Sequence, residues 1–253
     1  PSIEGTRFNL DADTSMYSVT NRAYTSINDA VDTNLGVWDI LGLMNLYGLN
    51  ASTNIDDNVY QLSNLSGYTP IYDVGGIDTI NFAESSENIF TILPSINTTK
   101  ANLTDAIEVA AGGGYITHSD GQLTTFSLFG EIENLHTGSG NDTLTGNELS
   151  NNINAGDGND TINITPGSDT VFGGSGIDIF NLSQNTIASF SSEVAIQTII
   201  KDFELGLDII SFNGFDEILF TLNENGFAKY SVGSNLDVVL ENIEVDVRLE
   251  LPT

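Results

Sequence analysis

The chain contains no cysteine and very few basic residues. Six Lys and Arg are set against 35 Asp and Glu, which gives a formal net charge of −29 at pH 7. The missing cysteines exclude disulfides, thiolate metal sites and cysteine nucleophiles. The negative charge repels phosphate backbones and anionic lipid, which excludes binding to nucleic acid or membranes through basic patches and leaves cations as natural partners.

Histidine and long apolar runs are also scarce. The sequence has 2 His and lacks the H-E-x-x-H string of zinc peptidases, so we expect no zinc site on this chain and assign no catalytic residue. No apolar run reaches the roughly 20 residues of a membrane span, so we expect no membrane insertion. The first residues, PSIEGTRFN, lack the basic-then-apolar pattern of a cleavable export signal.

Short strands between turns dominate the expected secondary structure. The 25 glycines cluster with Asn and Asp, which favours turns. We expect strands at 59–62 and 78–82 and a hairpin at 220–232. One helix is predicted at 37–47, where apolar residues recur at helical spacing. The expected fold class is therefore all-β, with one short helix near the N-terminus.

An internal repeat of nine residues is the most informative feature of the sequence. A polar series and an apolar series share this period: Glu133, Asp142, Asn151, Asp160, Asp169 and Asp178, and, two residues after each, Leu135, Leu144, Ile153, Ile162, Val171 and Phe180. Each nonapeptide is expected to form a turn and a short strand that buries the apolar residue. Two nonapeptides then close one coil, so that loops 18 residues apart stack along each edge.

The stacked loops have the chemistry of a calcium site. The expected stacks are Asp142, Asp160 and Asp178 on one edge, and Glu133, Asn151 and Asp169 on the other. Carboxylate and carbonyl oxygens are the ligands that Ca²⁺ prefers. One buried side chain per nonapeptide makes a thin core, so we expect ion binding and folding to be coupled. An ordinary β-solenoid with Asn-Gly-Asp turns is the alternative.

These repeats resemble the RTX nonapeptide G-G-x-G-x-D-x-U-x. The match is strong at 137–145, 155–163 and 173–181, and partial at 146–154 and 164–172. The resemblance implies a right-handed parallel β-roll held together by calcium.

A second resemblance covers more of the chain. WDILGLMNLYGLN (38–50), NIDDNVY (54–60), YDVGGIDTINF (72–82) and GEIENLHTGSGNDTLTGN (130–147) occur in that order. Together they are similar to the C-terminal half of serralysin-type secreted metalloproteases of the peptidase M10 family. This resemblance implies three parts: a connector and helix at 1–50, a β-roll at 51–181 with core repeats at 128–181, and a C-terminal region at 182–253. That last region is expected to hold antiparallel, sandwich-like strands and a secretion signal.

The two resemblances also imply the calcium ligands. Before the repeats these are Asn54, Asp56, Asp57, Asn58, Asp73, Gly75, Gly76, Asp78, Glu131 and Glu133. In the strong repeats they are Thr137, Ser139, Asp142, Ala155, Gly156, Asp157, Gly158, Asp160, Gly174, Gly176 and Asp178. A weaker ion is expected between the loops that contain Gly146, Glu148 and Asn151 and those that contain Gly167 and Asp169, and Asp202 and Asp208 would close the last site, or else be solvated turn acids. In all, roughly three to six Ca²⁺ ions are expected.

Three functions remain open from the sequence. The first is a secreted, extracellular calcium-binding module that leaves the cell unfolded by type I secretion and folds where calcium is abundant. The second is the calcium-binding part of a zinc endopeptidase whose catalytic domain lies on another segment or fragment. The third is a structural or adhesive RTX protein. The segment 96–129 is expected to be either a surface loop or an edge hairpin.

Overall fold

A computed structural model describes residues 54–65, 67–73, 75–94, 112–184, 196–216, 218–232 and 236–244. Nearly all regular structure in these residues is β-strand, which confirms the predicted all-β class. The helix predicted at 37–47 lies outside the described residues. No helix in the described part of the chain is long and apolar enough to cross a membrane.

The strands form two sheets. The first sheet is nine-stranded, and its spatial order is β1 (Val59–Gln61), β3 (Thr79–Asn81), β7 (Asn134–His136), β9 (Asn152–Asn154), β11 (Thr170–Phe172), β13 (Ile196–Ile200), β17 (Leu236–Glu244), β16 (Phe227–Val232) and β15 (Ile218–Leu222). Neighbours are parallel from β1 to β17, and β16 and β15 continue the sheet as antiparallel strands.

The second sheet has eight strands. Its order is β14 (Ile209–Asn213), β12 (Ile179–Ser183), β10 (Thr161–Ile164), β8 (Thr143–Thr145), β4 (Asn88–Ile92), β5 (Gly112–Thr117), β6 (Leu123–Gly130) and β2 (Thr69–Asp73). Neighbours are parallel from β14 to β4 and again between β6 and β2, whereas β5 is antiparallel to both of its neighbours.

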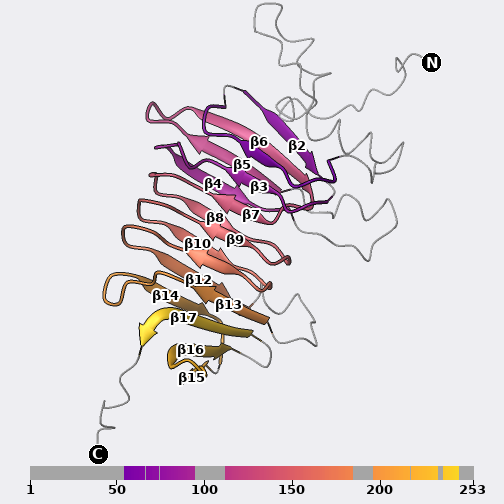
Figure 1. Cartoon of the computed structure of the whole chain (residues 1–253). Coiled ribbons are helices and arrows are strands. Elements are labelled where there is room, and N and C mark those ends of the chain that lie inside the picture. The colour runs from indigo at the N-terminus through magenta and orange to yellow at the C-terminus, as the bar shows by residue number, and fades with distance from the viewer. Residues whose placement is uncertain are drawn as a thin grey trace, which may run out of the picture.

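Successive strands from β7 to β14 alternate between the two sheets, so each coil contributes one strand to each sheet. Within a sheet, Thr161 pairs with Thr143, and Thr170 with Asn152, at a spacing of 18 residues. This register confirms the stacking predicted from the nine-residue period. Figure 1 shows the strands stacked from β2 and β6 at one end, through β7 to β14 in chain order, to β15 and β16 at the other end.

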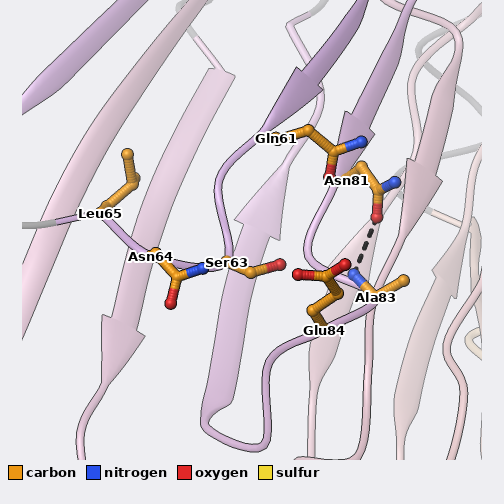
Figure 2. A pocket seen from close by; sticks show the side chains of 7 residues that line it. All are labelled: Gln61, Ser63, Asn64, Leu65, Asn81, Ala83 and Glu84. Atoms are coloured by element: carbon orange, nitrogen blue, oxygen red, sulfur yellow. Dashed lines mark hydrogen bonds between the residues drawn. The ribbon is translucent and has the colours of Figure 1, made fainter.

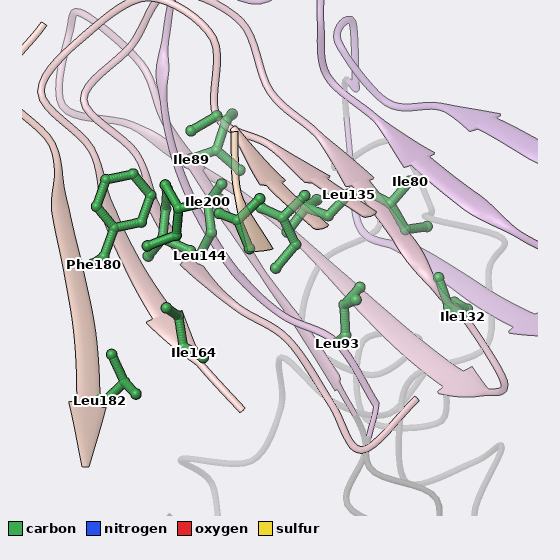
Figure 3. Close-up of a cluster of buried hydrophobic side chains, with 14 of the residues drawn as sticks. Ile80, Ile89, Leu93, Ile132, Leu135, Leu144, Ile164, Phe180, Leu182 and Ile200 are labelled. Carbon is green, nitrogen blue, oxygen red and sulfur yellow. The ribbon is translucent and has the colours of Figure 1, made fainter. Parts of the chain in front are cut away.

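The core lies between the sheets and is built from the apolar series of the repeat. Leu135, Ile153 and Val171 enter it from the first sheet, and Leu144, Ile162 and Phe180 from the second; all six are at most 1% exposed. Figure 3 shows Leu135, Leu144 and Phe180 among the side chains of this core. The predicted burial of one apolar residue per nonapeptide is therefore confirmed.

Two regions depart from the simple coil. The described part of segment 96–129 forms the β5–β6 hairpin, which is inserted between β4 and β2 rather than placed at a sheet edge. The hairpin predicted at 220–232 is confirmed as β15 and β16, with its turn near Gly226. However, the antiparallel strands expected at the C-terminus extend the first sheet, because β17 pairs in parallel with β13.

Candidate functional site

The loops that lead from the first sheet to the second form one stack. We call the loops 137–142, 155–160, 173–178 and 201–208 the first loop stack; each joins a strand of the first sheet to the next strand of the second. Asp142, Asp160 and Asp178 each occupy the last position of their loop and are at most 2% exposed. The fold thus buries three carboxylates in a row, one per coil.

A ladder of hydrogen bonds connects these carboxylates. The backbone N–H of Asp142 donates to Asp160 Oδ1 at 2.7 Å, and the N–H of Asp160 donates to Asp178 Oδ1 at 2.9 Å. The N–H of Ile89, in the preceding coil, donates to Asp142 Oδ1 at 2.7 Å. Each carboxylate therefore uses one oxygen to hold the backbone of the coil before it.

The second carboxylate oxygen of each of these residues is left without a partner. The Oδ2 atoms of Asp142, Asp160 and Asp178 are buried and accept no hydrogen bond from the described residues. The Thr137 hydroxyl near Asp142 donates instead to the Ala155 carbonyl at 2.6 Å. A buried, unpaired carboxylate oxygen is costly unless a cation or a proton neutralises it. The donor set therefore fits a hard cation such as Ca²⁺, which binds oxygen ligands.

Burial also raises the pKa values of Asp142, Asp160 and Asp178 in the first loop stack. Burial raises the pKa of Asp160 from its ordinary 3.8 to about 8, and the nearby carboxylates of Asp142 and Asp178 contribute to the rise. Burial likewise raises the pKa of Asp178 to about 6 and raises that of Asp142. Without a cation, the fold favours protonated acids at these positions.

Glycines allow the loops to approach closely. Gly174 has a φ of +93°, and a Cβ atom there would lie 1.7 Å from the Gly156 carbonyl oxygen of the coil below. That carbonyl accepts the N–H of Ser175 at 2.9 Å, so the backbones of neighbouring loops bond directly to each other. Only a residue without a side chain permits this spacing.

Loop 201–208 continues the ladder beyond the repeats. The N–H of Asp178 donates to Asp208 Oδ1 at 3.0 Å, and both oxygens of Asp202 accept the N–H groups of Gly173 and Gly174 at 2.9 Å. Asp202 and Asp208 therefore bind the loop above them and are not solvated turn acids. Asp178 is also not the last acid of its stack.

A second group of acids lies at the N-terminal end of the described structure. The N–H of Asn58 donates to Asp78 Oδ1 and the N–H of Asp78 to Glu133 Oε2, both at 2.8 Å. Asp73 is buried beside them and accepts the Tyr60 hydroxyl at 2.6 Å. The Oδ2 atom of Asp78 has no partner among the described residues, and burial raises the pKa of Asp78 to about 6. We call Asn58, Asp73, Asp78 and Glu133 the N-terminal cluster.

The other predicted N-terminal ligands surround this cluster. Asp57 Oδ1 accepts the N–H of Ile77 at 2.9 Å, and the Glu131 N–H donates to the Asp73 carbonyl at 2.9 Å. Asn54 has a φ of +50° and donates from Nδ2 to the Tyr72 carbonyl at 2.8 Å. The Asp56 carbonyl accepts Asn58 Nδ2 and lies against Gly76, whose φ is +123°, and the Gly75 N–H donates to Asp73 Oδ1 at 3.2 Å. The fold thus brings the predicted N-terminal ligands together.

The loops on the opposite edge are arranged differently. We call the loops 131–133, 146–151 and 165–169 the second loop stack; each joins the second sheet to the first. The Asn151 N–H donates to Asp169 Oδ1 at 3.0 Å, which repeats the ladder, and burial raises the pKa of Asp169 to about 7. However, Asn151 Nδ2 donates to Asn147 Oδ1 and to the Glu133 carbonyl, so an amide group stands between this loop and loop 131–133.

The remaining predicted ligands lie in or beside the two stacks. Ser139 and Asp157 are exposed, Glu148 is half-buried, and Gly158 and Gly176 have φ values of +135° and +137°. A Cβ atom at Gly146 or Gly167 would lie 2.5 Å from the side-chain oxygen of Asn151 or Asp169, respectively. The Asp157 carboxylate is close enough to Asp160 to contribute to the raised pKa of that buried acid.

No compact acidic or histidine cluster accompanies these loops. Within the described ranges, no three His, Cys, Asp or Glu side chains converge as a ready-made metal group. In the first loop stack the buried acids are instead distributed one per coil. A metal ion in that stack would combine one or two carboxylates with loop carbonyls.

Two shallow pockets lie beside the loops and offer little chemistry. One, of about 330 Å³, is lined by Gln61, Ser63, Asn64, Leu65, Asn81, Ala83 and Glu84. Figure 2 shows its amide and hydroxyl groups, and the N–H of Ala83 bonded to Asn81 Oδ1 at 2.8 Å. The other, of about 310 Å³, lies over the first loop stack and is lined in part by Glu84, Ser139 and Asp157. Neither lining includes a histidine or an aromatic side chain.

The ladder extends beyond the regular nine-residue series. Asn58, Asp78 and Asp208, which the resemblances implied as ligands, occupy the same ladder position as the repeat acids. Each is followed two residues later by an apolar or aromatic residue, at Tyr60, Ile80 and Ile210, as in the repeats. Sequence reasoning missed the role of Asn147, because its partners are backbone carbonyls distant in the sequence.

Comparisons with known proteins add no assignment. No protein-family model matches the chain, and no curated protein matches it.

Proposed function

We propose that this chain is a calcium-binding module of the RTX type, a right-handed parallel β-roll in which ions bound between the coils complete the fold. The observation that carries the proposal is a set of four buried carboxylate oxygens, on Asp78, Asp142, Asp160 and Asp178, that have no partner within the described ranges. Calcium supplies the positive charge that these oxygens lack, and the loop carbonyls supply further ligands.

The residues assign at least two places to the ions. In the first loop stack, Asp142, Asp160 and Asp178 would hold calcium between adjacent coils. In the N-terminal cluster, Asp78 would hold it with Asp73 and Glu133. Asp202 and Asp208 support the lower end of the first stack through their bonds to the loop of Asp178.

The biological setting follows from the sequence resemblance alone. We propose that the module is secreted, folds where calcium is abundant, and supports the secretion and stability of a serralysin-like metalloprotease without catalysing a reaction itself. The excess of acidic residues suits this route, because carboxylates without calcium repel one another and oppose premature coil closure.

Calcium titration of the purified chain tests the function. We expect calorimetry to show several bound Ca²⁺ ions and circular dichroism to show β-structure that melts at a much lower temperature when EDTA removes them. Asp160→Asn should reduce calcium binding, whereas the matched change at exposed Asp216, Asp216→Asn, should not. A wild-type protein that binds no calcium, or a melting temperature unchanged by exhaustive chelation, would refute the proposal.

A further inference from the structure

The second loop stack contains two buried asparagines that bind each other. Asn147 and Asn151 are 3% and 2% exposed and belong to the loop between β8 and β9. The N–H of Asn147 donates to Asn151 Oδ1 at 2.9 Å, and Asn151 Nδ2 donates back to Asn147 Oδ1 at 2.7 Å. The two side chains therefore close this loop on itself.

Their remaining amide protons reach into the preceding coil. Asn147 Nδ2 donates to the carbonyls of Pro94 and Ile132, both at 2.9 Å, and Asn151 Nδ2 donates to the carbonyl of Glu133 at 3.0 Å. A side-chain amide has two protons to donate. All four protons of the pair are thus used, and three of them hold carbonyl oxygens of the neighbouring coil.

The first loop stack has an acid, and not an amide, between its adjacent coils. At the matching position of its coil, Asp160 is an ionisable acid with a buried oxygen that has no partner among the described residues. Asn151 carries no charge, and its Nδ2 protons point at the carbonyl oxygens that a cation would otherwise attract. A cation placed beside these protons would be repelled, and it would find the oxygens already bonded.

We propose that the Asn147–Asn151 amide pair takes the place of a bound cation between loops 131–133 and 146–151, so that Asn151 holds this coil as a hydrogen-bond donor and not as a calcium ligand. The inference rests on the proposed calcium function of the first loop stack. It replaces the ligand role expected for Asn151.

Ion counting combined with denaturant unfolding tests this inference. Asn151→Ala should bind as many Ca²⁺ ions as the wild type by equilibrium dialysis, yet unfold at a lower denaturant concentration both with calcium and in EDTA. The matched control is Asn152→Ala, because Asn152 is the next residue and is exposed on β9. This control should change neither quantity. Loss of one ion in Asn151→Ala would overturn the inference.

A second variant covers the case in which Asn151→Ala does not fold. Asn151→Asp keeps the size of the side chain but removes both donors and adds a buried charge. It should lower the denaturant midpoint in EDTA more than Asn152→Asp does. If Asn151→Asp instead bound calcium more tightly with an unchanged ion count, the wild type would already hold an ion there and the inference would be wrong.

The outcome for the wild type separates the two proposals. A wild-type protein that binds no calcium would overturn the proposed function. In that case, a lowered midpoint for Asn151→Ala would still identify the amide pair as the closure of this coil, and an unchanged midpoint would reject that role too.

Discussion

At the residue scale, the two carboxylate oxygens of each buried aspartate in the first loop stack have different roles. Oδ1 of Asp160 accepts a backbone hydrogen bond from the preceding coil, and Oδ2 has no partner in the part of the chain that the structure describes. The first oxygen serves the fold whether or not an ion is present, whereas the second makes the fold dependent on a cation or a proton. Substitutions that keep the hydrogen-bonding oxygen but remove the negative charge are therefore the most informative.

Asp160→Asn removes the negative charge of this side chain but keeps an oxygen that can accept the Asp142 N–H. We expect the calcium midpoint of folding to rise by roughly an order of magnitude for each site that loses a carboxylate, because ligand charge controls Ca²⁺ affinity. Asp160 has acids in the loops on both sides, whereas Asp142 faces Ile89 on one side, so Asp160→Asn should raise the midpoint more than Asp142→Asn. Calcium titrations followed by circular dichroism measure the order, and equal midpoints for the two variants would contradict it.

The same carboxylates predict an unusual pH dependence without calcium. Burial raises the folded-state pKa of Asp160 to about 8, of Asp169 to about 7, and of Asp178 to about 6, from an ordinary 3.8. The folded state then binds more protons than the unfolded state, so stability is greatest below about pH 4 and falls as the pH rises through 6 to 8. Thermal melts in EDTA should show this fall, and Asp160→Asn should flatten its upper part. Saturating calcium should reverse the trend, because the ions compete with the protons. Stability in EDTA that rises from pH 5 to pH 8 would count against this account.

At the scale of the loop, backbone contact between coils sets the spacing. Gly156 and Gly174 occupy equivalent positions in successive coils. Each lies against the carbonyl of the equivalent glycine in the preceding coil. These contacts leave no room for a side chain. They also fix where the loop carbonyls lie relative to the buried acids.

Gly174→Ala tests the contact separately from backbone strain. Both Gly174 and Gly206 have positive φ, +93° and +88°, but a Cβ atom at Gly206 meets nothing within 4 Å. Gly206→Ala reports the strain alone, and Gly174→Ala adds a clash with the Gly156 carbonyl. We expect Gly174→Ala to lower the free energy of unfolding by roughly 1–3 kcal/mol more than Gly206→Ala does. Denaturant unfolding in calcium measures both, and equal losses would show that the coils can move apart freely.

At the scale of the whole molecule, charge opposes folding until cations bind. The net charge of −29 is spread over 253 residues, and only two Lys–acid ion pairs, Lys201–Glu241 and Lys229–Asp237, occur in the described part of the chain. Dissolved salt screens the repulsion between exposed acids, but it screens the buried carboxylates much less. The effects of exposed and buried acids on stability can therefore be distinguished.

Salt and calcium should have different effects on the chain. Raising NaCl to about 1 M shortens the screening length to about 3 Å, so the melting temperature in EDTA should rise modestly. It should remain below that of the calcium-saturated protein, since Na⁺ in bulk does not neutralise the buried Oδ2 atoms. Potassium chloride serves as a control for specific sodium binding. Full recovery of the calcium-saturated melting temperature by NaCl alone would mean that surface repulsion, not the buried acids, controls folding.

The sequence by itself determined the repeating part of this protein. The shared period of the polar and apolar series fixed the coil length, the burial of Leu144, Ile162 and Phe180, and the stacking of Asp142, Asp160 and Asp178. A periodic sequence specifies periodic structure because every coil repeats the same local contacts. The chemistry of the buried acids could therefore be predicted with the fold.

Only the tertiary structure determined the contacts of the segments outside the nine-residue repeat. The β5–β6 hairpin enters the second sheet through pairing with β4, and Asn147 bonds to Pro94, 53 residues earlier in the sequence. Asp208 joins the ladder from 30 residues beyond Asp178. These contacts join segments whose separation follows no repeat, so no local pattern specifies them. Their partners are backbone N–H and C=O groups, which every residue carries, and only their positions in the folded chain show which of them is within reach.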